Sequence, residues 1–273
     1  MEYVLIKFRP IYPNQVDLVI ADLSENNFDG FEEVEGELKA YIPKELFNDN
    51  IIDIVSKHGI AYTQEIISET NWNEEWEKNF EPVLIPDYKQ NKNYCFIRAS
   101  FHEPEEALHE IIITPKMSFG TGHHATTYMM IQQMSRLDFK NKSVADFGTG
   151  TGILAIFAEK LGAVSIVAND YDSWCIENSK ENLIINNCKK TELILSSKFP
   201  AGSFDIVLAN INLNIIIENL ESIVDGCKND GIIILSGMLK QNIPTISEKL
   251  KEMQLYDIDI LEKDNWISVM VKK

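Results

Sequence analysis

The sequence has few cysteines, no long apolar run and no leader-like start, and each shortage excludes a class of protein. Its four cysteines form no CxxC pair and lie too far apart for a zinc cluster or a short disulfide framework, so we expect ordinary thiols. No segment approaches the roughly 20 apolar residues that cross a bilayer as a helix. The opening MEYVLIKFRP lacks a basic region followed by an apolar stretch and a cleavage site. We therefore expect a cytoplasmic protein without a membrane segment.

Basic residues are also scarce. The 273-residue chain carries 25 Lys and Arg against 42 Asp and Glu, which gives a formal charge of −17. Such a surface repels a phosphate backbone, so direct DNA binding is not expected, whereas a basic protein partner is permitted. Solubility alone explains the acidity equally well. The hydrophobic share of 45% is typical of globular proteins, and the length suits a catalytic domain with a smaller partner domain.

Residues 1–67 predict a small α+β domain with ferredoxin-like βαββαβ order. The expected elements span 3–9 (strand), 14–25 (helix), 28–42 (hairpin), 48–58 (helix) and 62–67 (strand). Residues 68–80 follow as a connecting helix with Trp72 and Trp76 on one face. We interpret this helix as a linker to a second domain at 81–273.

In the second domain, Ile- and Val-rich strands alternate with helices from Val144 onward, which predicts a parallel sheet covered on both faces. The end of the chain differs, because YDIDILEKDNWISVMVKK offers two strands joined by a polar turn at 263–265. The expected fold is an α/β, Rossmann-like doubly wound sheet with a terminal antiparallel hairpin. It resembles class I methyltransferases, whereas a nicotinamide-binding fold more often ends with another parallel crossover.

The stretch VADFGTGTGILAI places Gly148, Gly150 and Gly152 between a strand and a helix. Glycines allow a sharp turn and a close approach to a ligand, and the helix N-terminus presents free N–H groups. The spacing is GxGxG, not the GxGxxG of dinucleotide sites. Asp146 at the head of the loop would repel a pyrophosphate but can help hold, directly or through water, a cationic amino group.

The next strand, SIVAND, ends in Asp170, whose carboxylate can accept hydrogen bonds from two ribose hydroxyls. A glycine loop alone is a weak signal, and this carboxylate makes the combination specific. Asp172 competes for that role but fits better as the N-cap of the helix that starts near Ser173.

Asn210 ends the fourth strand in VLANIN, at the sheet edge where ligands bind. Its side-chain carbonyl can accept a hydrogen bond from a substrate amine, which makes it the candidate catalytic residue. The alternative is that Asn210 only caps the helix after Asn212. The following Ile-Asn-Leu lacks the prolines and the aromatic residue that stack a flipped base, so a nucleobase substrate is not expected.

Upstream, the loop TPKMSFGTGHHATT leads into a helix. The adjacent His123 and His124 project in different directions, so no metal site is expected. Thr126 and Thr127 can offer hydroxyls to a ligand or cap the helix, and spacing alone does not decide between these roles.

The motifs FGTGHHATT, DFGTGTGILAI, AND, ANI and SGML, in this order, resemble those of the ribosomal protein L-11 methyltransferases. The resemblance covers roughly the C-terminal three-quarters of the chain, and the first sixty-odd residues match only in length and apparent topology. It implies S-adenosyl-L-methionine as cofactor. By position, the implied cofactor contacts are Thr127, Gly148, Asp170 and Asn210. To these we add Asp146 and Gly150 of the glycine loop, and Phe119, Gly120 and Thr121 of FGTGHHATT.

The resemblance further implies a protein N-methyltransferase whose substrate is ribosomal protein L-11, methylated on lysine side chains and the N-terminal amine. The domain at 1–67 would then recognise this substrate, and we expect a monomer. The alternative is a small-molecule N- or O-methyltransferase of the same fold. The segment SSKFPAGS is very short for the adenine side of the site, which leaves Ser196 and Ser197 as its candidate contacts.

Overall fold

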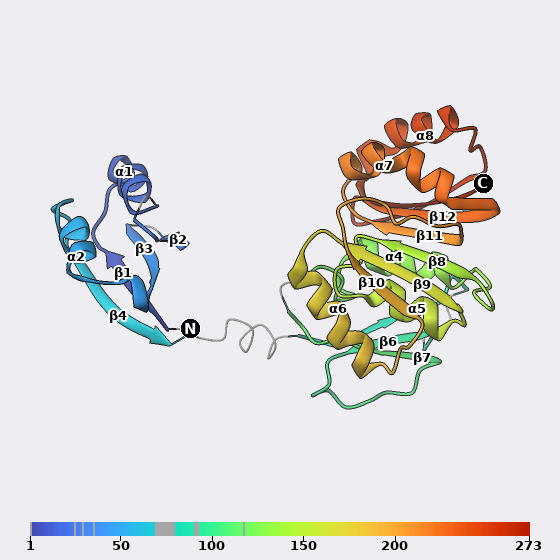
Figure 1. The fold of residues 1–273 in the computed structure, drawn as a ribbon, viewed down its shortest axis with the longest axis horizontal. Helices are drawn as coiled ribbons and strands as arrows, with labels where there is room; N and C mark the ends of the chain where they lie inside the picture. Colours follow the sequence, from blue (N-terminus) through green and yellow to red (C-terminus); the bar gives the residue numbers. More distant parts are fainter. Residues whose placement is uncertain are drawn as a thin grey trace. The chain divides into compact units, whose positions relative to one another are not determined.

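The structure is a computed structural model that describes residues 2–24, 26–28, 30–34, 36–68, 80–89, 93–116 and 118–273 (Figure 1). The chain divides into two compact units, residues 1–76 and 77–273. The connecting helix is expected at 68–80, and residues 69–79 of this range lie outside the described residues. No helix in the described part of the chain is long and apolar enough to span a membrane.

The first unit is a four-stranded antiparallel sheet in the order β2-β3-β1-β4, with two helices. Its elements are β1 (Glu2–Phe8), α1 (Pro13–Ser24), β2 (Gly30–Val34), β3 (Glu37–Pro43), the short 3-10 helix η1 (Lys44–Leu46), α2 (Asp49–Ser56) and β4 (Tyr62–Ser68). Alternate residues of β3 are buried, and Leu38 and Ile42 pack with Leu23 of α1 and Val55 of α2. This confirms the expected ferredoxin-like domain.

The second unit contains a seven-stranded sheet in the order β10-β9-β8-β11-β12-β14-β13. Its strands are β8 (Ser143–Phe147), β9 (Ser165–Asp170), β10 (Thr191–Leu195), β11 (Phe204–Asn210), β12 (Cys227–Leu239), β13 (Ile258–Lys263) and β14 (Trp266–Lys272). The first five strands in this order are parallel, and β14 runs antiparallel to both of its neighbours. The Rossmann-like sheet and its terminal hairpin are confirmed, with β13 at the edge.

Helices cover both faces of this sheet (Figure 1). They are α4 (Ala125–Met134), α5 (Ile153–Lys160), α6 (Ser173–Ile185), α7 (Leu213–Gly226) and α8 (Ile243–Glu252), with the 3-10 helix η2 (Lys240–Asn242) before α8. Side chains such as Val144 pack with α4, α5 and α6 on one face, and their neighbours such as Ala145 pack with α7 and α8 on the other. Successive residues of a strand point to opposite faces, so a strand covered on both sides is apolar throughout.

A small three-stranded sheet precedes the large one, and the sequence analysis did not predict it. It consists of β5 (Val83–Ile85), β6 (Cys95–Arg98) and β7 (His109–Ile112), in the order β5-β6-β7. Ile85, Ile97 and Ile111 are fully buried in the same core as α5. This sheet therefore anchors the segment that leads to the FGTGHHATT motif.

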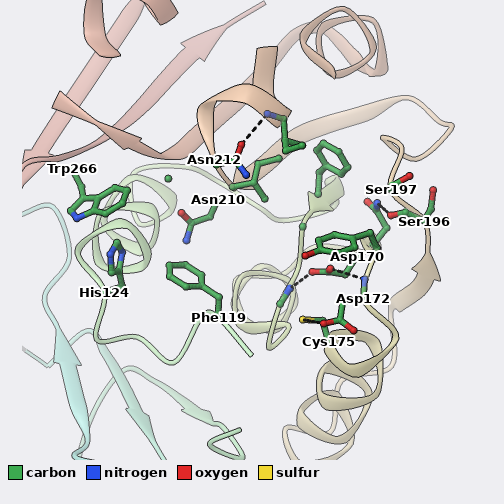
Figure 2. A pocket seen from close by; sticks show the side chains of 18 residues that line it. Phe119, His124, Asp170, Asp172, Cys175, Ser196, Ser197, Asn210, Asn212 and Trp266 are labelled. Atoms are coloured by element: carbon green, nitrogen blue, oxygen red, sulfur yellow. Dashed lines mark hydrogen bonds between the residues drawn. The ribbon is translucent and has the colours of Figure 1, made fainter. Parts of the chain in front are cut away.

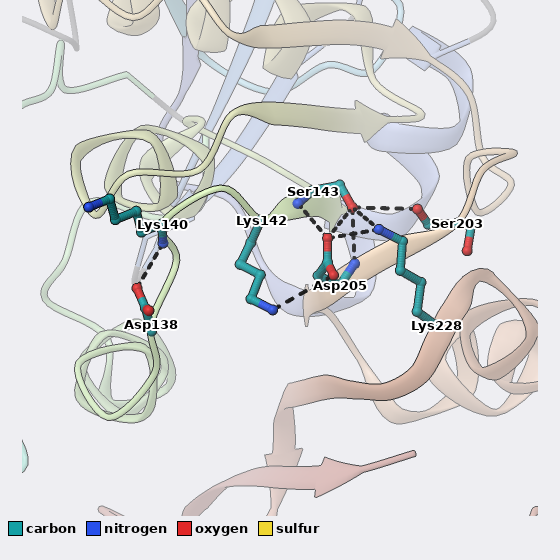
Figure 3. Close-up of polar contacts among 7 residues, drawn as sticks. All are labelled: Asp138, Lys140, Lys142, Ser143, Ser203, Asp205 and Lys228. Atoms are coloured by element: carbon teal, nitrogen blue, oxygen red, sulfur yellow. Dashed lines mark hydrogen bonds and ion pairs between the residues drawn. The ribbon is translucent and has the colours of Figure 1, made fainter.

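At the amino end of the large sheet, a cluster of paired polar groups joins three strands (Figure 3). The backbone N–H and the hydroxyl of Ser143 donate to the carboxylate of Asp205 at 2.9 and 2.7 Å. Lys228 Nζ lies 2.9 Å from the same oxygen, and Lys142 Nζ lies 3.8 Å from the other. Both oxygens of Asp205 thus have partners from within the domain.

Candidate active site

A cavity of about 600 Å³ opens at the carboxyl ends of β8, β9, β11 and β12 (Figure 2). This volume lies within the usual range for small-molecule sites. Most lining residues lie at or just after the ends of the parallel strands, and others precede α4 or lie on β12 and β14. They are Phe119, His124, Phe147, Gly148, Gly150, Asn169, Asp170, Tyr171, Asp172, Cys175, Ser196, Ser197, Asn210, Ile211, Asn212, Ile215, Gly237 and Trp266. The strand-end position is where α/β folds bind ligands.

The glycine loop, residues 148–152, turns sharply between β8 and α5. Gly148 has φ +76° and Gly150 has φ +55°, in the left-handed region that favours glycine. A Cβ on Gly148 would collide with the side chain of Ile211, and one on Gly150 would collide with the carbonyl oxygen of Phe119. Both glycines line the cavity, and both are also required by the protein segments packed against them.

Asp170 lies at the end of β9 and lines the cavity, with 7% of its surface exposed. Its Oδ2 accepts from Gly150 N at 3.0 Å, and its Oδ1 accepts from Asp172 N at 3.1 Å. Each oxygen thus keeps a free lone pair. Asp172 is the N-cap of α6, because its side chain accepts from Trp174 N. The helix-capping interpretation of Asp172 is confirmed.

Asp146 lies behind the glycine loop and does not line the cavity. Its side chain is fully buried, and the Thr149 hydroxyl donates to it at 2.6 Å. Burial raises its pKa to about 7, although hydrogen bonds from Thr149 and the Ala155 backbone act in the opposite direction. Any effect of Asp146 on a ligand would therefore pass through the loop in front of it.

Figure 2 shows Asn210 between His124 and Trp266 on one side and Asp170 on the other. Its Nδ2 donates to Thr127 Oγ1 at 3.4 Å, whereas its buried Oδ1 has no hydrogen-bond partner among the described residues. The alternative role of helix cap is wrong, because Asn212 caps α7 by accepting from Ile215 N. A buried acceptor without a partner is costly, and a ligand that donates to it would remove that cost.

Some residues of the FGTGHHATT motif line the cavity, and others lie outside it and contact the lining residues. Phe119 lines the cavity, but Gly120 and Thr121 do not; the Thr121 hydroxyl lies 3.3 Å from His123 Nδ1. Thr127 is fully buried and contacts Asn210. Thr126 is not the cap of α4, because its N–H donates to the N-cap residue His124. In the described residues no group of three His, Cys, Asp or Glu could hold a metal ion.

Phe119, His124 and Trp266 form one side of the cavity, which we call the aromatic wall. The ring centroids of Phe119 and His124 lie 5.1 Å apart, and those of His124 and Trp266 lie 4.6 Å apart. Burial lowers the pKa of His124, so its ring is neutral at physiological pH. The sequence analysis missed Trp266, whose only signal was its position directly after the hairpin turn.

The opposite side is formed by Asn169, Ser196 and Ser197. Asn169 Nδ2 donates to Ser196 O at 2.9 Å and to Lys198 O at 3.1 Å, which fixes the short turn after β10. Its buried Oδ1 has no partner within the described part of the chain. The two serines that the sequence analysis proposed thus lie at the cavity, and Asn169, which it did not name, holds their backbone.

Comparison with known proteins identifies the family of the chain. The family model for ribosomal protein L11 methyltransferase matches residues 15–273. The ribosomal protein L11 methyltransferase of Phocaeicola vulgatus is 38% identical, over 98% of this chain and 98% of its own. That of Porphyromonas gingivalis is 37% identical, over 93% of this chain and 89% of its own.

Solved structures show the same fold. The ribosomal protein L11 methylase from Lactobacillus delbrueckii subsp. bulgaricus matches with a TM-score of 0.61 and 28% identity, over 69% of this chain and 98% of that one. A methyltransferase from Pyrococcus furiosus matches with a TM-score of 0.51 at 17% identity, over 60% of this chain and 89% of that one, which concerns the fold alone. The sequence and structural matches together show that this chain belongs to the ribosomal protein L11 methyltransferase family.

Proposed function

We propose that this protein transfers methyl groups from S-adenosylmethionine to amino groups of ribosomal protein L11, on lysine side chains, the N-terminal amine, or both. The two relatives described above, which are 38% and 37% identical to this chain, are both named ribosomal protein L11 methyltransferase. The observation that carries the proposal is the cavity at the strand ends, where each oxygen of Asp170 accepts one hydrogen bond and can accept another, and Asn210 holds a buried acceptor without a partner among the residues that the structure describes.

The residues of the cavity fit this cofactor. Asp170 would hold the ribose hydroxyls, since a carboxylate can accept from both. The backbone of the glycine loop would hold the methionine part, and Ser196 and Ser197 would contact the adenine end. The side-chain oxygens of Asn169 and Asn210, which have no partner in the described part of the chain, add two positions where a polar ligand would supply the missing donor. When bound, the cofactor supplies an electrophilic methyl group on a sulfonium.

The aromatic wall and Asn210 would receive the acceptor amine. A lysine amine has a pKa of about 10.4 in water, and an apolar wall favours the neutral form that can act as a nucleophile. Asn210 Oδ1 would accept from the amine N–H and so direct the nitrogen lone pair. His124 is a poor base, because its Nδ1 already accepts from Thr126 N. We infer that water takes the proton before transfer.

The first unit, residues 1–76, would serve recognition. The cavity described above lies wholly in the second unit, and binding a flexible target elsewhere raises the concentration of its amine at the site. The chain's charge of −17 suits a basic ribosomal protein.

The direct test incubates the protein with purified ribosomal protein L11 and S-adenosylmethionine labelled in the methyl group. We expect label in L11, and peptide mass spectrometry should locate it on lysine and N-terminal amino groups. Label on other side chains would contradict the amine assignment. No transfer to L11, with transfer to small amines or alcohols, would favour the small-molecule alternative.

A shortened chain tests the role of the first unit. A fragment that begins near Glu81 should bind S-adenosylhomocysteine like the full chain and lose about tenfold or more in kcat/KM on intact L11. Its kcat/KM on a short lysine peptide should equal that of the full chain. Equal activity of fragment and full chain on intact L11 would show that the first unit does not select the substrate.

A further inference from the structure

Two loops that line the cavity touch through their backbones. One is the glycine loop, and the other is the Phe119 loop, residues 118–121. Gly150 has no room for a Cβ because the carbonyl of Phe119 lies against it. Conversely, a Cβ on Gly120, which has φ +106°, would lie 2.7 Å from the hydroxyl of Thr151. A glycine on each side thus permits a contact that other residues would prevent.

Thr151 makes three hydrogen bonds at this contact and is fully buried. Its N–H donates to Phe119 O at 3.0 Å, and its hydroxyl donates to Gly120 O at 2.6 Å. Its own carbonyl accepts from Asn182 Nδ2 at 2.8 Å. Two of the three bonds therefore run to the Phe119 loop, and the third runs to helix α6.

Side chains of helix α6 also hold the glycine loop in place through hydrogen bonds. Asn182 Oδ1 accepts from Thr114 N at 2.8 Å, so one side chain joins the glycine loop to the segment that follows β7. Ser179 donates to Gly150 O at 2.7 Å. The glycine loop is also held by Asn169 O, which accepts from the N–H groups of Gly148 and Thr149. Without the Thr151 hydroxyl, the glycine loop would keep these supports, whereas the Phe119 loop would lose one of its two bonds to Thr151.

We propose that Thr151 is a positioning residue for the acceptor: its hydroxyl holds the Phe119 loop, and through it the aromatic wall, at a fixed place against the glycine loop. The ring centroids of Phe119 and His124 lie 5.1 Å apart, and those of His124 and Trp266 lie 4.6 Å apart. A shift of Phe119 would therefore also shift the other two rings. The inference rests on the proposed function, in which the aromatic wall receives the acceptor and the glycine loop the cofactor. Small displacements of a positioned reactant reduce transfer strongly.

The test compares Thr151→Val, which removes the hydroxyl at constant shape, with Thr151→Ser, which retains it. The control is Asn186→Leu, which removes part-buried side-chain bonds from the C-cap of α6 to the backbone of Ile112 and of Asn182 but touches neither loop. We expect Thr151→Val to lower kcat/KM on L11 by about tenfold or more and to change the Kd for S-adenosylhomocysteine by less than about threefold. Thr151→Ser and Asn186→Leu should keep both values within about threefold, even where Asn186→Leu lowers the melting temperature.

Equal losses in kcat/KM and cofactor affinity, or normal kcat/KM in Thr151→Val, would overturn the inference. If Thr151→Val does not fold, Thr151→Ala removes the same hydroxyl without added bulk and is measured in its place. Amide hydrogen exchange gives a readout independent of L11: exchange at 118–124 should accelerate in the variant and stay unchanged at 165–171. Unchanged exchange at 118–124 would also overturn it. Failure of the wild type to methylate L11, with accelerated exchange in the variant, would instead reject the proposed acceptor.

Discussion

Strands β8 and β11 carry polar side chains at both ends of the large sheet, and the two ends differ in whether these side chains have hydrogen-bond partners. At the amino end, Ser143 and Asp205 hydrogen-bond to each other, and Lys228 completes the cluster. At the carboxyl end, the same strands carry Asp146 and Asn210, and Asn210 Oδ1 is buried without a partner among the described residues. The polar groups at the amino end are satisfied within the protein. At the carboxyl end, the unpaired acceptor carries a free-energy cost that a bound ligand would offset.

The two aspartates show the same contrast. Partial burial alone would raise the pKa of Asp205, but hydrogen bonds from Ser143 and Lys228 outweigh it and hold that pKa well below its usual range. For Asp146, burial prevails over the hydrogen bond from Thr149, and the pKa rises to about 7. The protein therefore stabilises the charge of Asp205 at the amino end and disfavours that of Asp146 near the carboxyl end.

The largest effect is expected from Asn210→Ala. If Asn210 orients the amine, kcat on L11 should fall on the order of a hundredfold, equivalent to about 2.7 kcal/mol of transition-state stabilisation. The melting temperature should change little, because Oδ1 has no partner among the described residues and the bond from Nδ2 to Thr127, the one side-chain bond lost, is long at 3.4 Å. Kinetics and thermal unfolding of the same sample check this. A large stability loss with normal kcat would make Asn210 a structural residue and remove the contrast between the two ends.

Asp205→Asn should act at the opposite end and on the opposite property. Its loss of charged hydrogen bonds with Ser143 and Lys228 should lower the free energy of unfolding by about 2–3 kcal/mol. Affinity for S-adenosylhomocysteine should be unchanged, since Asp205 is remote from the cavity-lining residues. Denaturant unfolding and calorimetry measure the two quantities. A weakened ligand affinity in a folded variant would show that the two ends are coupled.

Asp170→Ala should weaken the binding of S-adenosylhomocysteine by about 1.5–3 kcal/mol, the scale of lost hydrogen bonds to a charged group. Calorimetry measures the change, and Asp205→Asn serves as the matched control, an aspartate removed from the same sheet. Unchanged affinity in folded Asp170→Ala would reject the ribose assignment.

Asp146→Asn should give the smallest effect, visible in its pH dependence. Because the folded-state pKa of Asp146 is about 7, the folded protein retains a proton that the unfolded chain releases. The resulting stability is complete below about pH 4 and is lost as pH rises through about 7. Asp146→Asn cannot ionise, so its free energy of unfolding relative to the wild type should increase as pH rises from about 4 to about 8.

Unfolding in denaturant at acidic and mildly alkaline pH compares the two aspartates directly. The contribution of Asp205 has the reverse sign, because its folded pKa is lowered: it is present above about pH 4 and lost in more acidic solution. A variant Asp146→Asn that loses stability equally at both pH values would show that the buried carboxylate is not strained by its charge.

The residues at the carboxyl end were accessible from sequence because a simple rule places them. Asp170 and Asn210 each end an apolar strand, and parallel strands bring their carboxyl ends together. No such rule applies at the amino end: the partners Ser143, Asp205 and Lys228 are separated along the chain and meet only in the folded sheet.

Two further features were hidden for physical reasons. Strands β5, β6 and β7 have three or four residues each, too short to show a periodic pattern. Helix α6 carries Asn178 and Asn182 one turn apart, a pattern typical of a solvated helix. In the structure both side chains are buried, and Asn182 hydrogen-bonds to the backbone of other segments. Only tertiary contacts distinguish these two cases.

A crystal structure of the protein with S-adenosylhomocysteine would test the central claim most directly. The account predicts the ligand in the cavity at the strand ends, with its ribose hydroxyls on Asp170, its adenine beside Ser196 and Ser197, and its sulfur on the side of Asn210. The cluster around Asp205 should be unchanged. A ligand bound elsewhere, or in the cavity with its ribose away from Asp170, would contradict it.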